Sequence, residues 1–252
     1  MLLNFKSDKV RAAIRPLFAA DCERIARGQL PERAWETDIY VTRRCNMSCS
    51  YCYVKDYFDR DYPFVDPSLP QLWALIDALA DKTYGLVVLG GEPLVRRDLA
   101  EILRYARERG IPSIRVATNG TLVKRAMEAL RYVDRINVSL DGTRKHEFPE
   151  VVERMQRDIC EVRQEMGRDF PSVCISYTLA QNDLFEQDIL PVIRFARENG
   201  FDIKFLACKY PNNDVNWDFL RAVVERARGY VCDETLLNVR ELTQKIIAVQ
   251  VS

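Results

Sequence analysis

The chain has 252 residues, of which 48% are hydrophobic and 29% charged, and its 37 basic and 37 acidic residues give a net charge of zero. This length and composition predict one large soluble α/β domain. The charge balance argues against bulk electrostatic binding to nucleic acid or to an anionic membrane, and no apolar run approaches the roughly 20 residues that span a bilayer.

The first part of the chain, residues 1–35, is predicted to be a helical extension. Apolar residues recur at helical spacing over 7–28, and Pro16 inside this pattern predicts a kink or a restart of the helix. Residues 36–43 then have the pattern of a strand, which leads directly into a run of cysteines.

Strand and helix signals alternate along the next part of the chain. The predicted strands cover 36–43, 85–90, 113–118, 135–141, 172–180 and 202–208, and the predicted helices cover 68–82, 95–109, 123–133, 147–166, 184–199 and 217–229. Such alternation is typical of a parallel sheet with helices on its outer face. We therefore predict a partial (β/α)6 barrel with parallel strands over 36–210, and a helical extension over 211–252 whose last helix covers about 235–250.

The predicted strands are polar on one face, although buried parallel strands are normally apolar on both. The side-chain period of a strand is two, so the polar residues share one side of the sheet. We expect this side to line the concave interior of the barrel as a ligand cavity. The polar set is Tyr40, Thr42, Arg44, Arg115, Asn119, Asn137, Ser139, Asp141, Cys174, Ser176, Thr178, Lys204 and Cys208.

Three cysteines follow the first predicted strand with the spacing C-x3-C-x2-C: Cys45, Cys49 and Cys52. Thiolates are soft ligands suited to iron–sulfur clusters and to zinc. A structural zinc ion needs four ligands, usually as two pairs, and the chain has one histidine, His146, and no second cysteine pair. The other cysteines are scattered singly: Cys22, Cys160, Cys174, Cys208 and Cys232. Three ligands on a [4Fe–4S] cube would leave one iron open to another molecule.

Three further motifs stand where predicted strands end: Gly90-Gly91-Glu92-Pro93, Thr118-Asn119-Gly120 and Ser139-Leu140-Asp141-Gly142. Each motif alone is typical of a turn or a helix cap. Together with the cysteine spacing, and in this order, they make residues 36–210 resemble the radical S-adenosylmethionine (radical SAM) enzymes. Asn182, after the fifth predicted strand, matches an asparagine that the family carries there.

The resemblance implies that Cys45, Cys49 and Cys52 hold one [4Fe–4S] cluster, whose open iron binds the amino and carboxylate groups of SAM. It implies that Gly90 and Gly91 let the backbone approach the methionyl amine, and that Glu92 or nearby carbonyls balance the positive charge of this amine.

The remaining cofactor contacts implied by the resemblance come from later strand ends. Ser139, Asp141 and Asn119 are expected to hydrogen-bond the ribose hydroxyls and the methionyl carboxylate. Tyr51 matches an aromatic position beside adenine. Thr178 and Asn182 complete the expected cofactor-binding set. All these positions fall at the carboxyl ends of strands, where α/β barrels place their chemistry.

The implied reaction is the transfer of one electron from the reduced cluster to SAM, which releases methionine and a 5′-deoxyadenosyl radical. This radical removes a hydrogen atom from a substrate or adds to it. An external electron donor, flavodoxin-like or ferredoxin-like, is expected, and so is a cytoplasmic location because the chain has no secretory signal. The aromatic segment 53–64 is expected either to cap the site or to be a surface loop.

The substrate is less clearly indicated by the sequence. Arg44, Arg115 and Lys209 favour a small anionic molecule such as a nucleotide, a sugar phosphate or a lipid precursor, although solvated surface charges are the alternative. Cys208 is a candidate hydrogen-atom donor or a small buried apolar residue. The tail carries no second cysteine set, which predicts a single cluster. The alternative functions are a peptide- or protein-modifying enzyme, including an activator of a glycyl-radical partner, and an electron-transfer protein.

Overall fold

Six parallel strands form one sheet, and their order in the sheet follows the chain from β1 to β6. The computed structural model describes residues 8–52, 54, 65–180, 182–207, 217–227 and 230. The strands are β1 (Thr37–Thr42), β2 (Gly85–Gly90), β3 (Ser113–Thr118), β4 (Arg135–Ser139), β5 (Ser172–Leu179) and β6 (Asp202–Ala207). Neighbouring strands pair in parallel, and β1 and β6 form the two edges. The predicted α/β fold with a six-stranded partial barrel is confirmed.

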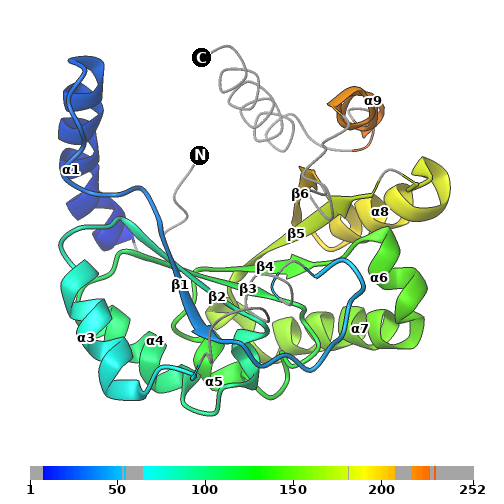
Figure 1. Ribbon diagram of the computed structural model, residues 1–252, viewed down its shortest axis with the longest axis horizontal. Helices are drawn as coiled ribbons and strands as arrows, with labels where there is room; N and C mark the ends of the chain where they lie inside the picture. The colour runs from blue at the N-terminus through cyan, green and yellow to red at the C-terminus, as the bar shows by residue number, and fades with distance from the viewer. Residues whose placement is uncertain are drawn as a thin grey trace.

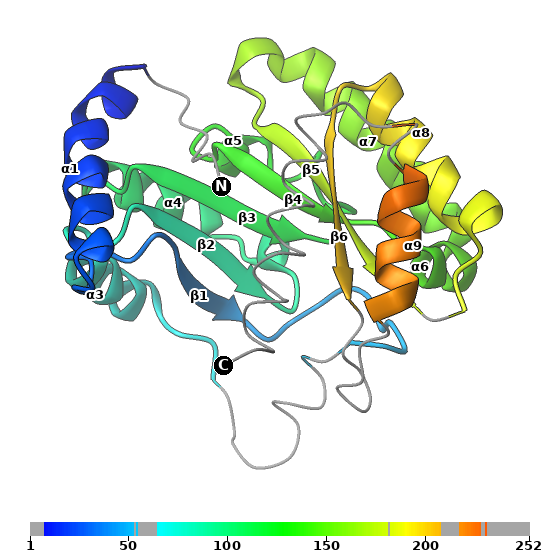
Figure 2. The ribbon, with the colours of Figure 1, turned by 90° about the horizontal axis from the view of Figure 1, so that it is seen from above.

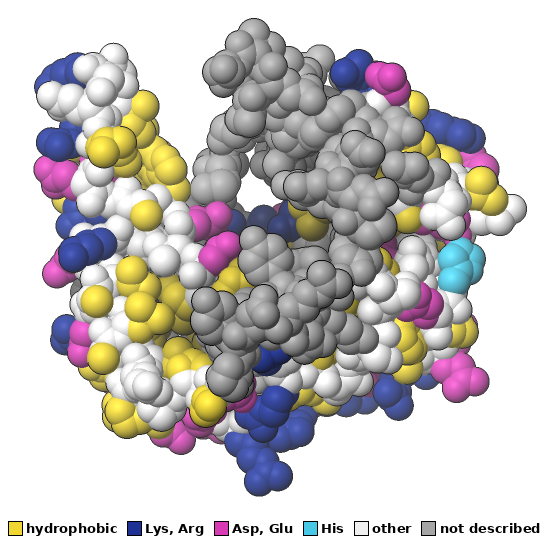
Figure 3. Space-filling view, viewed as in Figure 1, with side chains coloured by type: hydrophobic (Ala, Val, Ile, Leu, Met, Phe, Trp, Pro, Cys, Tyr) yellow, Lys and Arg dark blue, Asp and Glu magenta, His cyan; other side chains and the backbone are white. Residues whose placement is uncertain are grey.

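The connecting helices lie on one side of the sheet (Figure 1). They are α3 (Leu69–Leu79), α4 (Leu99–Glu108), α5 (Met127–Leu130), α6 (Gly142–Glu147), α7 (Pro149–Met166) and α8 (Leu190–Glu198). On the other side, Figure 2 shows α1 (Asp8–Ala26) at the amino ends of the first strands and α9 (Trp217–Ala227) beside β6. The face drawn in Figure 3 is hollowed near its middle, and Lys or Arg side chains are visible at the floor of this hollow.

The apolar residues of the strands face the helices and form the core. Val88, Val116, Ile136 and Ile175 are completely buried, and in β4 buried residues alternate with half-buried ones. Full burial of an aliphatic side chain contributes about 1.5–3 kcal/mol relative to exposure, which fixes which face of each strand meets the helices. The polar residues of the strands consequently point to the opposite, interior side of the sheet.

Several helices differ from their predicted bounds. α5 is shorter than the predicted 123–133, because the residues before it form turns in which Ala126 N donates to Leu122 O and Val123 O. The predicted helix 147–166 is observed as two helices, α6 and α7, which together begin earlier, at Gly142. The division falls after Glu147, because Pro149 has no N–H to donate and begins α7. The predicted helix 184–199 begins with a π-helical turn, η3 (Phe185–Ile189), before α8.

The helix α1 is joined to the sheet through a buried aspartate. α1 continues past Pro16 without the predicted restart. Asp21 accepts hydrogen bonds from Glu32 N (2.7 Å), Arg33 N (3.2 Å) and the Tyr84 hydroxyl (2.8 Å). Burial opposes ionisation of Asp21, but these bonds outweigh it and lower its pKa. Through Tyr84 they tie α1 to the amino end of β2.

Some predicted features lie outside the described residues. These are the last helix over 235–250, most of the segment 53–64, and the side chains of Cys208 and Lys209. Among the helices that the structure describes, none is both long enough and apolar enough to cross a membrane.

Candidate functional site

Cys45, Cys49 and Cys52 lie on the loop that leaves the carboxyl end of β1. The Cys45 residue is exposed, Cys52 is half-buried and Cys49 is buried. A hydrogen bond from Cys52 N to Cys49 O (3.4 Å) closes a turn in this loop. Burial raises the pKa of the Cys45 and Cys49 thiols, so the binding of a metal centre would release protons.

The donor set of this loop fits an iron–sulfur cluster better than a zinc ion. In the described part of the chain, no three Cys, His, Asp or Glu side chains gather closely enough to hold one metal ion. A cube has four separate irons, so its cysteines need not converge on one point. Two donors are directed at Cys45 Sγ, Met47 N at 3.4 Å and Asn119 Nδ2 at 3.9 Å, and hydrogen bonds to sulfur tune such clusters.

Gly90 and Gly91 at the end of β2 lie against the backbone that leads into the cysteine loop. Gly91 N donates to Thr42 O (2.9 Å), and Glu92 N donates to Arg44 O (2.8 Å). A Cβ at Gly91 would lie 2.4 Å from Arg43 O, and one at Gly90 would lie 2.6 Å from Thr42 O. The observed need for glycine is therefore the close packing of two segments of this chain.

The Glu92 side chain is completely buried and engaged by the protein. Oε1 accepts from Leu94 N (3.0 Å) and the Thr118 hydroxyl (2.7 Å), and Oε2 accepts from Asn119 N (2.6 Å). Burial raises the pKa of Glu92 and the hydrogen bonds oppose this rise. The carboxylate joins the end of β2 to the end of β3 and has no exposed face toward a ligand. The expected partner of the methionyl amine was either Glu92 or nearby backbone carbonyls, and this geometry is compatible with the carbonyls.

Asn119, at the end of β3, contacts the cysteine loop directly. Its Nδ2 donates to Asn46 Oδ1 (2.9 Å) and reaches Cys45 Sγ, while its Oδ1 accepts from Thr121 N (3.0 Å). The side chain is buried. The structure therefore places Asn119 beside the first cysteine, where it holds the loop.

Asp141 and Tyr51 connect the end of β4 to the same loop. The Tyr51 hydroxyl donates to Asp141 Oδ2 (2.7 Å) and Oδ1 (2.9 Å), and Arg144 N donates to Oδ1 (2.9 Å). Burial raises the pKa of Asp141 and of Tyr51. One turn further, Ser50 N donates to Glu147 Oε2 (3.2 Å). Of the S-x-D-G motif, Ser139 keeps a half-buried side chain, so it is more open to a ligand than Asp141.

Arg144, one of the basic residues that the sequence predicts at the mouth of the barrel, also belongs to this site, to which the sequence analysis did not assign it. It is buried, and its Nη1 donates to Ser139 O (2.7 Å). Burial disfavours its charge, but Tyr51, Cys49 and Asp141 outweigh burial and raise its pKa. A permanent positive charge thus lies close to the thiols. Its position three residues after Asp141, in the first turn of α6, is the sequence signal that connects it to this site.

The end of β5 carries Thr178 and Asn182, which were expected to contact the cofactor. Thr178 is half-buried and Asn182 is exposed on the turn after the strand. The adjacent Tyr177 hydroxyl accepts from Gly142 N (3.0 Å), and burial raises the pKa of Asp183 to about 6. The contact of Tyr177 with Gly142 holds the start of α6 against β5. No hydrogen bond between the described residues joins Asn182 to the cysteine loop.

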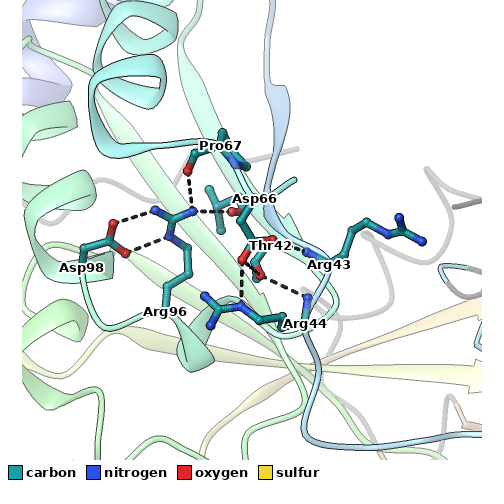
Figure 4. Close-up of polar contacts among 8 residues, drawn as sticks. Thr42, Arg43, Arg44, Asp66, Pro67, Arg96 and Asp98 are labelled. Carbon is teal, nitrogen blue, oxygen red and sulfur yellow. Dashed lines mark hydrogen bonds and ion pairs between the residues drawn. The ribbon is translucent and has the colours of Figure 1, made fainter. Parts of the chain in front are cut away.

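Arg44, expected to bind substrate, belongs to a network below the cysteine loop (Figure 4). Its Nε donates to Asp66 Oδ2 (2.7 Å), and Asp66 also accepts from the Thr42 hydroxyl (2.8 Å) and Arg43 N (3.0 Å). Burial opposes ionisation of Asp66, but these bonds lower its pKa. The network therefore fixes the segment before α3 to the end of β1, and Arg44 is engaged within it.

Arg96 supports the network from the other side (Figure 4). Its guanidinium pairs with Asp98 through Nε (2.8 Å) and Nη2 (2.6 Å), and Nη1 donates to Val41 O (2.7 Å) and Pro67 O (2.9 Å). All of these partners belong to the protein, so this arginine is structural. Arg115 lies elsewhere, in the interior of the sheet, where it pairs with Glu36 at 2.5 Å.

Comparison with known proteins matches this arrangement to one family. A family model described as the Radical SAM superfamily matches residues 39–223. A GTP 3',8-cyclase of Staphylococcus carnosus is 27% identical over 193 residues, which cover 73% of this chain and 56% of that protein. A probable GTP 3',8-cyclase of Metallosphaera sedula is 29% identical over 170 residues, covering 65% of this chain and 52% of that one. The chain thus spans about half the length of the curated relatives that it matches.

Solved structures show the same fold at low sequence identity. SuiB of Streptococcus suis, crystallised with the precursor peptide SuiA, superimposes with a TM-score of 0.63 at 20% identity and covers 87% of this chain and 50% of its own. Methylornithine synthase (PylB) gives a TM-score of 0.56 at 14% identity, over 89% of this chain and 70% of that one. A third structure, anSMEcpe with bound AdoMet, gives a TM-score of 0.53 at 16% identity, over 70% of this chain and 50% of that one.

Proposed function

The chain belongs to the radical SAM superfamily of enzymes, and we propose that it acts on a small anionic molecule, with Cys45, Cys49 and Cys52 as the ligands of its single [4Fe–4S] cluster. The observation that carries the proposal is the anchoring of the cysteine loop. Hydrogen bonds tie this loop to the ends of β2, β3 and β4 through Glu92 N, Asn119 and Asp141. A loop held at three strand ends is pre-organised for a rigid centre.

Enzymes of this family use a [4Fe–4S] cluster and SAM. When bound, the pair supplies reductive cleavage of SAM and with it a 5′-deoxyadenosyl radical; the protein contributes orientation and exclusion of competing reactions. Arg144 places a positive charge near the thiolates, and Asn119 donates to Cys45 Sγ. The carbonyls near Gly91, together with Ser139, Thr178 and Asn182, are the groups that we assign to SAM.

The proposal of a small anionic substrate has support from the curated relatives, whose names describe a cyclase acting on GTP. Because this chain spans about half of their length, we carry over only that the substrate is small and anionic, and neither its identity nor the number of its charges. A flavodoxin-like or ferredoxin-like electron donor completes the proposal, since cleavage of SAM consumes one electron.

The test is anaerobic reconstitution of the chain with iron and sulfide, followed by SAM and dithionite. We expect about four irons per chain, as one cube contains, and formation of 5′-deoxyadenosine. Cys49→Ala should abolish both. Cys160→Ala is the matched control and should leave both unchanged. This half-buried cysteine lies on α7, where its Sγ donates a hydrogen bond to Asn199 Oδ1 (3.2 Å).

Two outcomes would contradict the proposal. About eight irons per chain would show a second cluster. A reduced cluster that produces no 5′-deoxyadenosine would favour the electron-transfer alternative.

A further inference from the structure

The interior side of the sheet carries two cations that the cysteine loop does not use, the buried Arg115 and the half-buried Lys204. Arg115 stands in β3 between the completely buried Ile114 and Val116, and Lys204 stands in β6 between the buried Ile203 and Phe205. Because neighbouring residues of a strand point to opposite faces, both cations point away from the helices. They therefore share the interior of the partial barrel, beneath the carboxyl ends of its strands.

Arg115 presents an unused edge of its guanidinium. The residue is 9% exposed, and its Nη1 pairs with Glu36 Oε1 at 2.5 Å. Its Nε and Nη2 are buried and have no hydrogen-bond partner in the described part of the chain. These two atoms form one side of the planar fork, and this side matches the two oxygens of a carboxylate. Buried donors are nearly always paired, so this edge indicates a missing acceptor.

Two more donors lie on β5 and β6, two strands that pair with each other. Ser176 in β5 is 6% exposed and its Oγ has no described partner. Its register partner across the sheet is Lys204. No described residue forms a hydrogen bond or an ion pair with the Lys204 ammonium, and burial lowers its pKa. Burial likewise lowers the pKa of Arg115, so both cations are desolvated without full compensation.

The charges that face this place leave one positive charge in excess. Arg135 is paired with Asp202 at 2.5 Å and is neutralised. Burial raises the pKa of the Cys174 thiol, which stays uncharged. Asp134, which also acts on Arg115, is paired with Arg107. Of the groups named here, Glu36 is then the carboxylate left to balance Arg115 and Lys204. One singly charged anion restores neutrality, whereas a phosphate dianion would leave a negative charge buried.

We propose that the interior of the barrel binds a carboxylate of the substrate, held by the Nε and Nη2 edge of Arg115, the Lys204 ammonium and the Ser176 hydroxyl. This rests on the proposed function only in identifying the bound molecule as the substrate.

The experiment measures the thermal unfolding of the full chain at pH 8 and constant ionic strength, with no SAM or reductant present. Acetate is the carboxylate probe, inorganic phosphate is the dianion probe, and acetamide is the uncharged probe. We expect acetate to raise the Tm saturably, as a ligand of the native state does, and to raise it more than phosphate or acetamide. The result does not depend on cleavage of SAM, so it can fail or succeed independently of the 5′-deoxyadenosine test.

Substitutions locate the effect. Arg115→Gln should weaken the apparent affinity for acetate about tenfold or more, as expected for the loss of a charge-assisted bond. Lys204→Met should do the same. It should also raise the Tm in a chloride buffer without acetate, because it removes a half-buried charge that no described residue pairs with. Arg157→Gln, at an exposed position on α7, is the matched control and should change neither quantity.

Three results would overturn the proposal. A larger rise in Tm with phosphate than with acetate would refute the carboxylate as the ligand. A rise in Tm with acetate no larger than with chloride at the same ionic strength would refute the site. Unchanged acetate binding in Lys204→Met would place the anion elsewhere, and this variant remains informative if Arg115→Gln fails to fold.

Discussion

The two polar regions of the barrel differ in how completely the protein satisfies them. At the carboxyl edge of the sheet, the Glu92 carboxylate accepts three hydrogen bonds and the Asp141 carboxylate accepts from Tyr51 and Arg144. In the interior, Arg115 and Ser176 keep buried donors with no described acceptor. At the edge, Arg144 Nε is the one donor of the groups named here that lacks a described acceptor. Since an unmade hydrogen bond is costly, the edge is more nearly complete as folded, and the interior awaits a ligand.

Removal of the Glu92 carboxylate should have the largest effect. Glu92→Ala leaves Leu94 N, the Thr118 hydroxyl and Asn119 N without their acceptor in a fully buried place. We expect the free energy of unfolding to fall by about 3–5 kcal/mol, measured by urea denaturation. The shape-conserving Glu92→Gln is the control and should cost less, because one oxygen still accepts and burial already disfavours the charge. Equal stability of Glu92→Ala and the wild type would show that the edge is not held in this way.

A methyl group at Gly91 should have the next largest effect. The Cβ of Gly91→Ala would lie 2.4 Å from Arg43 O and 2.6 Å from Arg44 O, so the segment entering the cysteine loop must move. We expect a loss of about 1–3 kcal/mol, typical of overpacking, and a lower iron content after reconstitution. Gly85→Ala, at the start of the same strand, would meet its nearest atoms at an ordinary 3.4 Å and should be nearly neutral. Similar losses at both positions would contradict a specific contact with the loop.

Deletion of one hydroxyl in each region should lower the free energy of unfolding at the edge but not in the interior. The Thr118 hydroxyl donates to Glu92 (2.7 Å) and accepts from Gly120 N (2.9 Å), so Thr118→Val should cost about 1–2 kcal/mol. The Ser176 hydroxyl has no described partner, so Ser176→Ala should be neutral or stabilising by up to about 1 kcal/mol. Paired urea denaturation curves measure both changes. A loss at Ser176 as large as that at Thr118 would erase the distinction between the regions.

Local patterns predicted the order and the faces of the elements well. The bounds of β2 and β3 agree with the predicted 85–90 and 113–118, and the apolar residues of β4 are buried as their period of two requires. Pro149 marks the division between α6 and α7, a signal present in the sequence but not weighed. Such features depend on residues a few positions apart.

The sequence could not predict which partner each site residue takes. The GGEP motif located Glu92 at a strand end, but two of the hydrogen bonds to its carboxylate come from Thr118 and Asn119 at the end of a different strand. In the same way, the ion pair of Arg44 depends on Asp66, and the raised pKa of Arg144 depends in part on Tyr51. These contacts join segments that are distant in the chain, and no local periodicity encodes them.

The strand order in the sheet is also the order in which the strands are synthesised. Each strand pairs with the strand made just before it, so the sheet can grow as the chain emerges. The cysteine loop follows the first strand, whereas Glu92, Asn119 and Asp141, which hold it, are synthesised later. A nascent chain therefore displays its thiols before their supports exist. Cluster insertion into a fixed loop must wait until the fourth strand has been made.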